Sequence, residues 1–201
     1  LKYHARYSIG EVIPAAVKIA REAASGKARV ALDVGPTGKL LKPAGDLDFE
    51  DAVKVFSQQI KLGVEAGVDL VVLETFTDLY ELKAAVIAAK ENSNLPIYAT
   101  VALDESGFLL TGGNVLAFSN LMEALRGDAY GFNCGLGPDK MLPFVESLSM
   151  RSTRPIIVKP NAGMPKIVGN ATVFSVGPKE FGKSISSLVK AGARIIGGCC
   201  G

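Results

Sequence analysis

Short apolar runs that alternate with amphipathic segments constrain the fold of this chain more than any other feature. The runs are rich in valine and isoleucine and span residues 28–33, 68–74, 95–102, 129–133, 155–159 and 193–198. Continuously apolar runs of this length are typical of strands buried on both faces of a parallel sheet. Segments with helical periodicity alternate with them, at 11–25, 49–66, 78–92, 114–126, 138–150 and 178–191.

This alternation predicts an α/β fold with right-handed crossovers. Two architectures fit it, a (β/α)8 barrel and an open doubly wound sheet. A whole barrel usually takes about 250 residues, whereas this chain has 201 and six predicted strands. The pattern also begins with a helix and ends with a strand. We therefore expect residues 1–201 to form one domain that is truncated at both ends.

Composition excludes several classes of protein. Hydrophobic residues make up 48% of the chain, and the formal net charge is +2 with both signs interspersed. A sizeable core is therefore expected, without the basic surface that binds nucleic acid or membranes. No apolar stretch approaches the roughly 18 residues needed to span a bilayer. The cysteine count is odd, at 3, which argues against a disulfide framework and favours the reducing cytoplasm.

All three cysteines follow predicted strands. Cys134 comes directly after the run 129–133, and Cys199 and Cys200 follow the run 193–198. In a barrel the carboxyl ends of strands converge on one face, so these thiolates could form a three-coordinate zinc site with an open position, as catalytic zinc sites have. The alternative is that each cysteine packs as a small hydrophobe.

Other polar residues also occur at strand ends. Glu74 closes an apolar run, where a carboxylate is costly unless paired. It could bind a substrate ammonium, act as a general acid or base, or form an ion pair. Lys159 could reach an anionic substrate or form an ion pair, and Asn161 is either near the cysteines or a turn residue. Asp33 is at the carboxyl end of the first run, and His4, the only histidine, is expected on the solvated surface.

Nucleotide-binding motifs are not satisfied. The segment 35–39 is superficially like a phosphate loop, but Leu40 stands where serine or threonine is needed. After Gly135 and Gly137, Lys140 occupies the position at which a dinucleotide fingerprint needs glycine or alanine.

Three motifs in order resemble the homocysteine S-methyltransferase domain family. They are GFNC at 131–134, KPNAG at 159–163 and GGCCG at 197–201. The loops DVGPTG at 33–38 and ETFTD at 74–78 are similar to the third- and fourth-strand loops of the family. The resemblance covers essentially the whole chain and is greatest to the homocysteine-binding domain of cobalamin-dependent methionine synthases.

The resemblance implies a (β/α)8 TIM barrel, of which this chain covers about strands 3 to 8. It also implies zinc-dependent methyl transfer to the thiol of homocysteine, giving methionine. By motif, Cys134, Cys199 and Cys200 would hold Zn²⁺, with Asn161 as a fourth ligand when substrate is absent. Glu74 would hold the homocysteine ammonium, with Asp33 also in the substrate site. The family's glycine-rich first-strand loop, which helps to bind the amino acid, has no counterpart here.

The donor implied by the resemblance is methylcobalamin on another domain or protein, with cobalamin- and folate-binding domains as partners. Alternatives within the family use S-methylmethionine, S-adenosylmethionine or a betaine. A corrinoid-linked methyltransferase acting on another thiol is a further alternative. Outside this class, the chain could be a metal-free α/β binding module with three packed cysteines.

Overall fold

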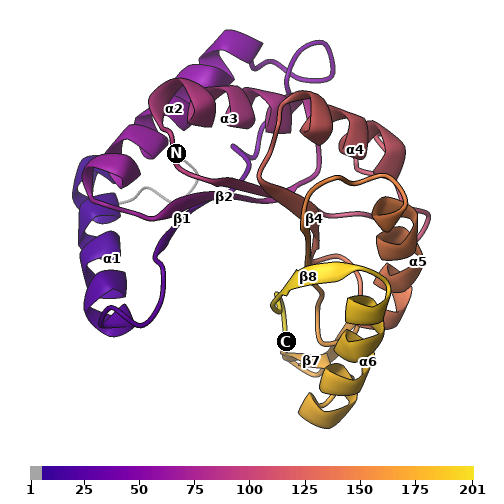
Figure 1. The fold of residues 1–201 in the computed structure, drawn as a ribbon. Helices are drawn as coiled ribbons and strands as arrows, with labels where there is room; N and C mark the ends of the chain where they lie inside the picture. The colour runs from indigo at the N-terminus through magenta and orange to yellow at the C-terminus, as the bar shows by residue number, and fades with distance from the viewer. Residues whose placement is uncertain (1–5) are drawn as a thin grey trace.

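Six parallel strands form a curved sheet whose convex side is covered by helices (Figure 1). The computed structural model describes residues 6–201, so His4 lies outside the described residues. The helices are α1 (Ile9–Ala24), α2 (Phe49–Glu65), α3 (Leu79–Asn92), α4 (Val115–Ala124), α5 (Pro138–Ser149) and α6 (Pro178–Lys190). The strands are β1 (Ala31–Val34), β2 (Leu70–Phe76), β3 (Ile97–Val101), β4 (Ala129–Asn133), β5 (Ile156–Lys159), β6 (Pro165–Val168), β7 (Ala171–Phe174) and β8 (Ala193–Ile196).

Strand order in the large sheet follows chain order, β1-β2-β3-β4-β5-β8. A doubly wound sheet would reverse its order at a switch point, whereas a barrel adds each strand beside the previous one. The order and the curvature in Figure 1 therefore identify barrel architecture. Within residues 6–201, β1 and β8 are the edge strands of this six-stranded sheet. All strand carboxyl ends lie at one rim, where Asn133 of β4 is opposite Lys159 of β5.

The helix layer packs on alternate residues of the strands. Tyr130 and Phe132 of β4 lie against Phe118 of α4, with ring centroids 5.5 and 6.0 Å apart. Because side chains alternate along a strand, the residues between and after them, Gly131 and Asn133, belong to the concave face. The outer face is thus apolar core, and the concave face is free to carry polar groups.

Capping side chains fix where two of the helices begin. Asp78 accepts a hydrogen bond from the Tyr80 amide at 2.7 Å at the start of α3, and Asn114 accepts from the Ala117 amide at 3.0 Å at the start of α4. Both helices therefore start directly after loops that border the carboxyl rim. None of the helices in the described part of the chain has the length and apolarity needed to cross a membrane.

The six predicted strands are all present, but the antiparallel pair β6–β7 was not predicted. This hairpin lies between β5 and α6 and is exposed along nearly its whole length. Its residues therefore lack the alternation of apolar and polar positions that marks a half-buried strand. The available signal was Gly169-Asn170 between two short β-branched runs, a dipeptide typical of tight hairpin turns.

Gly131 is expected to be intolerant of any side chain. A Cβ atom at this position would lie 1.9 Å from the Ile157 carbonyl oxygen in β5. We expect Gly131→Ala to lower the free energy of unfolding by at least about 2 kcal/mol, measured by urea denaturation, because backbone atoms must move. Gly182→Ala is the matched control, since Gly182 lies inside α6 with open space around it. That change should raise the free energy of unfolding by about 0.5–1 kcal/mol. If both substitutions changed stability equally, Gly131 would not be a position that excludes side chains.

Candidate metal and substrate site

The three cysteine sulfur atoms converge at the carboxyl rim of the sheet. Cys134 follows β4, whereas Cys199 and Cys200 follow β8, two positions along the sheet. The Cys200 Sγ lies 3.8 Å from the Cys134 Sγ and 3.8 Å from the Cys199 Sγ. All three sulfur atoms lie within 4.8 Å of one another. In residues 6–201, no other group of three His, Cys, Asp or Glu side chains meets this spacing. We call these three residues the cysteine cluster.

The loop after β5 holds the cysteine cluster from both sides. The Cys134 amide donates to the Lys159 carbonyl at 3.1 Å, and the Cys199 amide donates to the Pro160 carbonyl at 3.0 Å. Cys134 also has a left-handed backbone, with φ 57°, which turns the chain out of β4. The two cysteine segments are thus fixed relative to each other through backbone atoms.

Asn161 is buried beside the cluster, with 4% of its surface exposed. Its side-chain Oδ1 accepts a hydrogen bond from the Cys200 backbone amide at 3.0 Å. The Asn161 backbone amide donates to the Leu136 carbonyl at 2.9 Å. The Ala162 amide in turn donates to the Cys200 carbonyl at 2.8 Å. Asn161 therefore ties the loop after β5 to the backbone of Cys200.

The donor set and its spacing fit a zinc ion. Tetrahedral zinc with Zn–S bonds of about 2.3 Å separates its sulfur ligands by about 3.8 Å. Although Cys199 is exposed as a residue, loss of solvent around its thiol raises its pKa to about 12, and hydrogen bonding and repulsion from Cys134 and Cys200 act in the same direction. Three thiolates this close need a cation to coexist, and thiolate sulfur is a preferred ligand of zinc.

Glu74 and Lys159 form an ion pair on the concave face of the sheet. Lys159 Nζ donates to Glu74 Oε2, and the two side chains are only 19% and 21% exposed, respectively. The buried Asn133 side chain donates from Nδ2 to Glu74 Oε1 at 3.2 Å. The carboxylate that ends this apolar run therefore has the partners that its position requires.

Asp33, the second-last residue of β1, lies near enough to this pair to interact with both charges. Loss of solvent raises the pKa of the Asp33 carboxyl, the negative charge of Glu74 raises it further, and Lys159 opposes both. When all three groups are charged, the two carboxylates and one ammonium leave a net charge of −1 on this part of the concave face. The site is thus suited to one additional positive charge.

The raised pKa of Asp33 predicts a pH dependence of stability. The folded protein holds this proton more tightly than the unfolded chain, so stability contributed by Asp33 is lost as pH rises from the ordinary value of 3.8 through the raised value. Asp33→Asn should make the unfolding free energy fall less steeply from about pH 4 to pH 7, measured by urea titration.

Asp51 supplies a control of opposite sign for that experiment. Its pKa is lowered by a hydrogen bond from Lys54, so its stabilising effect is present above its ordinary pKa and lost as pH falls through the lowered value. Asp51→Asn should therefore lower stability at neutral pH relative to acidic pH. Parallel curves for Asp33→Asn and the native protein would contradict the role of Asp33.

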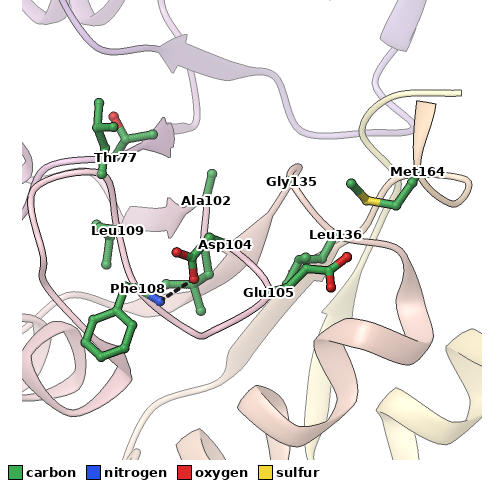
Figure 2. Close-up of a pocket in the computed structure, with 11 residues that line it drawn as sticks. Thr77, Ala102, Asp104, Glu105, Phe108, Leu109, Gly135, Leu136 and Met164 are labelled. Atoms are coloured by element: carbon green, nitrogen blue, oxygen red, sulfur yellow. Dashed lines mark hydrogen bonds between the residues drawn. The ribbon is translucent and has the colours of Figure 1, made fainter. Parts of the chain in front are cut away.

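Two cavities open on the carboxyl rim. The larger, of about 520 Å³, lies over the ends of β2, β3 and β4. Figure 2 shows Asp104 in this cavity accepting a hydrogen bond from the Phe108 amide, with Leu136 and Met164 contributing apolar surface. The smaller, of about 350 Å³, is lined by Cys199 and Cys200. The smaller cavity therefore opens at two of the three cysteines, and the larger one begins at Gly135, next to the third.

Sequence reasoning named Glu74, Lys159, Asn161 and the cysteines but missed the role of Asn133. The structure places Asn133 between Glu74 and the cysteine cluster, where its Nδ2 lies 3.7 Å from the Cys199 Sγ. The available signal was an amide that ends the otherwise apolar run 129–133, in the same way that Glu74 ends its run.

Comparisons with known proteins find relatives that cover most of this chain. The family model for homocysteine S-methyltransferase matches residues 1–201. Methionine synthases from Mycobacterium tuberculosis and Mycobacterium leprae are each 28% identical over 174 residues, which is 84% of this chain and 14% of each relative. The chain thus spans about one seventh of the length of these relatives.

Solved structures show the same fold. The apo form of the homocysteine methyltransferase MmuM from Escherichia coli superposes with a TM-score of 0.79 at 20% identity, covering 98% of this chain and 72% of that one. Its metallated form superposes with a TM-score of 0.71 at 21% identity, covering 96% and 65%. The curved sheet of this chain therefore has the same fold as the corresponding part of MmuM.

Proposed function

Because this chain belongs to the homocysteine S-methyltransferase family, we propose that it transfers a methyl group to the thiol of homocysteine, giving methionine. The observation that carries this proposal is the convergence of three sulfur atoms within 4.8 Å of one another beside a site with excess negative charge. The cysteine cluster would take the substrate sulfur, and the negatively charged site would take the substrate ammonium.

The cysteine cluster is assigned as the zinc site, with Cys134, Cys199 and Cys200 as ligands. A free thiol has a pKa of about 8.5, so only a few per cent is thiolate at neutral pH. Zinc bound at this cluster would supply a nucleophilic sulfur, because a coordinated thiol is deprotonated. We assign Asn161 as a fourth ligand when substrate is absent, because its Oδ1 keeps a second lone pair beyond its bond with the Cys200 amide.

Glu74 and Asp33 are assigned as the residues that hold the homocysteine ammonium. Lys159 neutralises one of the two carboxylates, and the remaining negative charge matches one ammonium. The Lys159 and Asn133 hydrogen bonds keep the Glu74 carboxylate fixed before substrate arrives. Preorganisation of this kind lowers the cost of binding.

The methyl donor is assigned as methylcobalamin on another domain or protein. The similarity to two methionine synthases, each far longer than this chain, supports cobalamin- and folate-binding domains as partners. The shared fold with the homocysteine methyltransferase MmuM keeps S-methylmethionine, S-adenosylmethionine and betaine as alternative donors. Three closely spaced free thiols favour a reducing compartment such as the cytoplasm.

The test combines metal analysis with methyl-transfer assays on the reduced, intact protein. We expect about one zinc per chain and production of methionine from homocysteine. Methylcobalamin, S-methylmethionine, S-adenosylmethionine and betaine, supplied separately, would identify the donor. A folded protein without zinc, or zinc-loaded protein that leaves homocysteine unchanged with every donor, would contradict the proposal.

A further inference from the structure

One buried side chain connects the Glu74 carboxylate to the cysteine cluster. Asn133 is fully buried at the end of β4. Its Nδ2 lies 2.7 Å from the Thr75 Oγ1, 3.2 Å from the Glu74 Oε1 and 3.7 Å from the Cys199 Sγ. An amide nitrogen has two hydrogens, so these three acceptors share two donors. Any movement of Glu74 or Cys199 therefore disturbs the same group.

The other end of the Asn133 amide holds an unusual backbone conformation. Its Oδ1 accepts a hydrogen bond from the Thr75 amide at 3.0 Å. Thr75 has a φ of 64°, and a β-branched residue in this left-handed region is strained. Such strain persists only where the surroundings enforce it, and Asn133 bonds both the backbone and the side chain of Thr75.

The strained residue coincides with an irregularity that directs Glu74. The register between β2 and β3 shifts between Leu73 and Phe76, which is the segment that contains Glu74 and Thr75. Irregularities of this kind re-aim side chains next to active sites. Asn133 thus sets both the direction of the Glu74 backbone and the position of its carboxylate.

We propose that Asn133 is a positioning residue that fixes the distance between the Glu74 carboxylate and the cysteine cluster, and thereby selects the length of the amino-acid thiol. This inference rests on the proposed function, in which Glu74 holds the ammonium and the cluster takes the sulfur. Homocysteine has one more methylene than cysteine between its ammonium-bearing carbon and its sulfur. A rigid spacing between the Glu74 carboxylate and the cysteine cluster therefore suits only one of these two amino acids.

Asn133→Ala tests the proposal in the intact, zinc-loaded protein. Cysteine and homocysteine are compared as methyl acceptors by kcat/KM and as ligands by calorimetry. One methylene is usually discriminated by about 10- to 200-fold, and we expect this preference to fall about tenfold. Zinc content should stay near one per chain, since all three cysteines remain. KM for homocysteine should rise more than kcat falls.

Two further variants separate positioning from folding. Asn133→Asp keeps the oxygen that accepts from the Thr75 amide but loses the donor to Glu74, so it should show the same loss of selectivity if Asn133→Ala does not fold. Asn92→Ala is the matched control, because the hydrogen bonds of Asn92 lie outside the site. Its side-chain amide donates to the Ser57 hydroxyl at 3.0 Å and to the Ala88 carbonyl at 2.7 Å. It should leave the selectivity unchanged.

The outcomes distinguish the two proposals. If the native protein neither binds nor methylates homocysteine, the proposed function is wrong and the selectivity argument fails with it. If the native protein prefers homocysteine and both Asn133 variants keep that preference, only the role of Asn133 is overturned. A crystal structure of Asn133→Ala should show Thr75 outside the left-handed region, and an unchanged Thr75 would also oppose the inference.

Discussion

Replacing Cys200 with serine is expected to remove zinc from the protein and to lower methyl transfer to homocysteine by more than about 100-fold. Cys200 is the central member of the cluster, with its sulfur 3.8 Å from each of the other two. Loss of a residue that merely supports a ligand costs about 10- to 100-fold, so loss of a ligand should exceed that range. Elemental analysis and a transfer assay measure the two effects.

The substitution is mild in other respects, which makes the result interpretable. The Cys200 amide still donates to Asn161 Oδ1, and the Cys200 carbonyl still accepts from the Ala162 amide. Circular dichroism of the variant should therefore match that of the metal-free native protein. Stoichiometric zinc together with normal turnover would rule out Cys200 as a ligand.

Replacing Glu74 with glutamine is expected to raise the KM for homocysteine about 30- to 150-fold without loss of zinc. The change leaves the Lys159 ammonium without its partner at a site where both side chains are about one-fifth exposed. The substrate ammonium would then meet a site whose net charge is no longer negative. Removing the carboxylate that pairs with a buried ligand ammonium costs about 2–5 kcal/mol, and the lower half of that range corresponds to the expected change in KM.

Glu22→Gln supplies the control for a lost carboxylate. Glu22 pairs with Lys18 at 3.9 Å on α1, and both side chains are largely exposed. Exposed pairs of this kind contribute little, so KM should be unchanged. If Glu74→Gln also left KM unchanged while zinc stayed bound, the ammonium would have to be held elsewhere.

Strand positions and barrel architecture could be predicted from the sequence because burial on both faces leaves a continuous apolar signal. The run 129–133 became β4, and the run 193–198 contains β8. The hairpin β6–β7 could not be found in this way, since exposure removes that signal. Its pairing depends on a local turn at Gly169 and on backbone hydrogen bonds rather than on burial.

The site was only partly accessible to sequence reasoning. Convergence of strand ends brings Cys134 towards Cys199 and Cys200, which follows from barrel topology alone. A carboxylate at the end of an apolar run, such as Glu74, needs a partner, but the sequence does not indicate which residue that is. The partner, Lys159, is 85 residues away in the chain. The role of Asn133 depends on a left-handed backbone at Thr75, and no residue preference for threonine indicates that conformation.

The long separation between the cysteine segments has a consequence for folding. Cys134 and Cys200 are 66 residues apart in the chain, so an ion bound to both is a cross-link that closes a large loop. For a covalent bridge, closing a loop of this size removes about 4 kcal/mol of chain entropy from the unfolded state, and metal clips act by the same principle. Metal bound for chemistry would therefore also anchor the edge strand β8 and helix α6, which both lie within that loop.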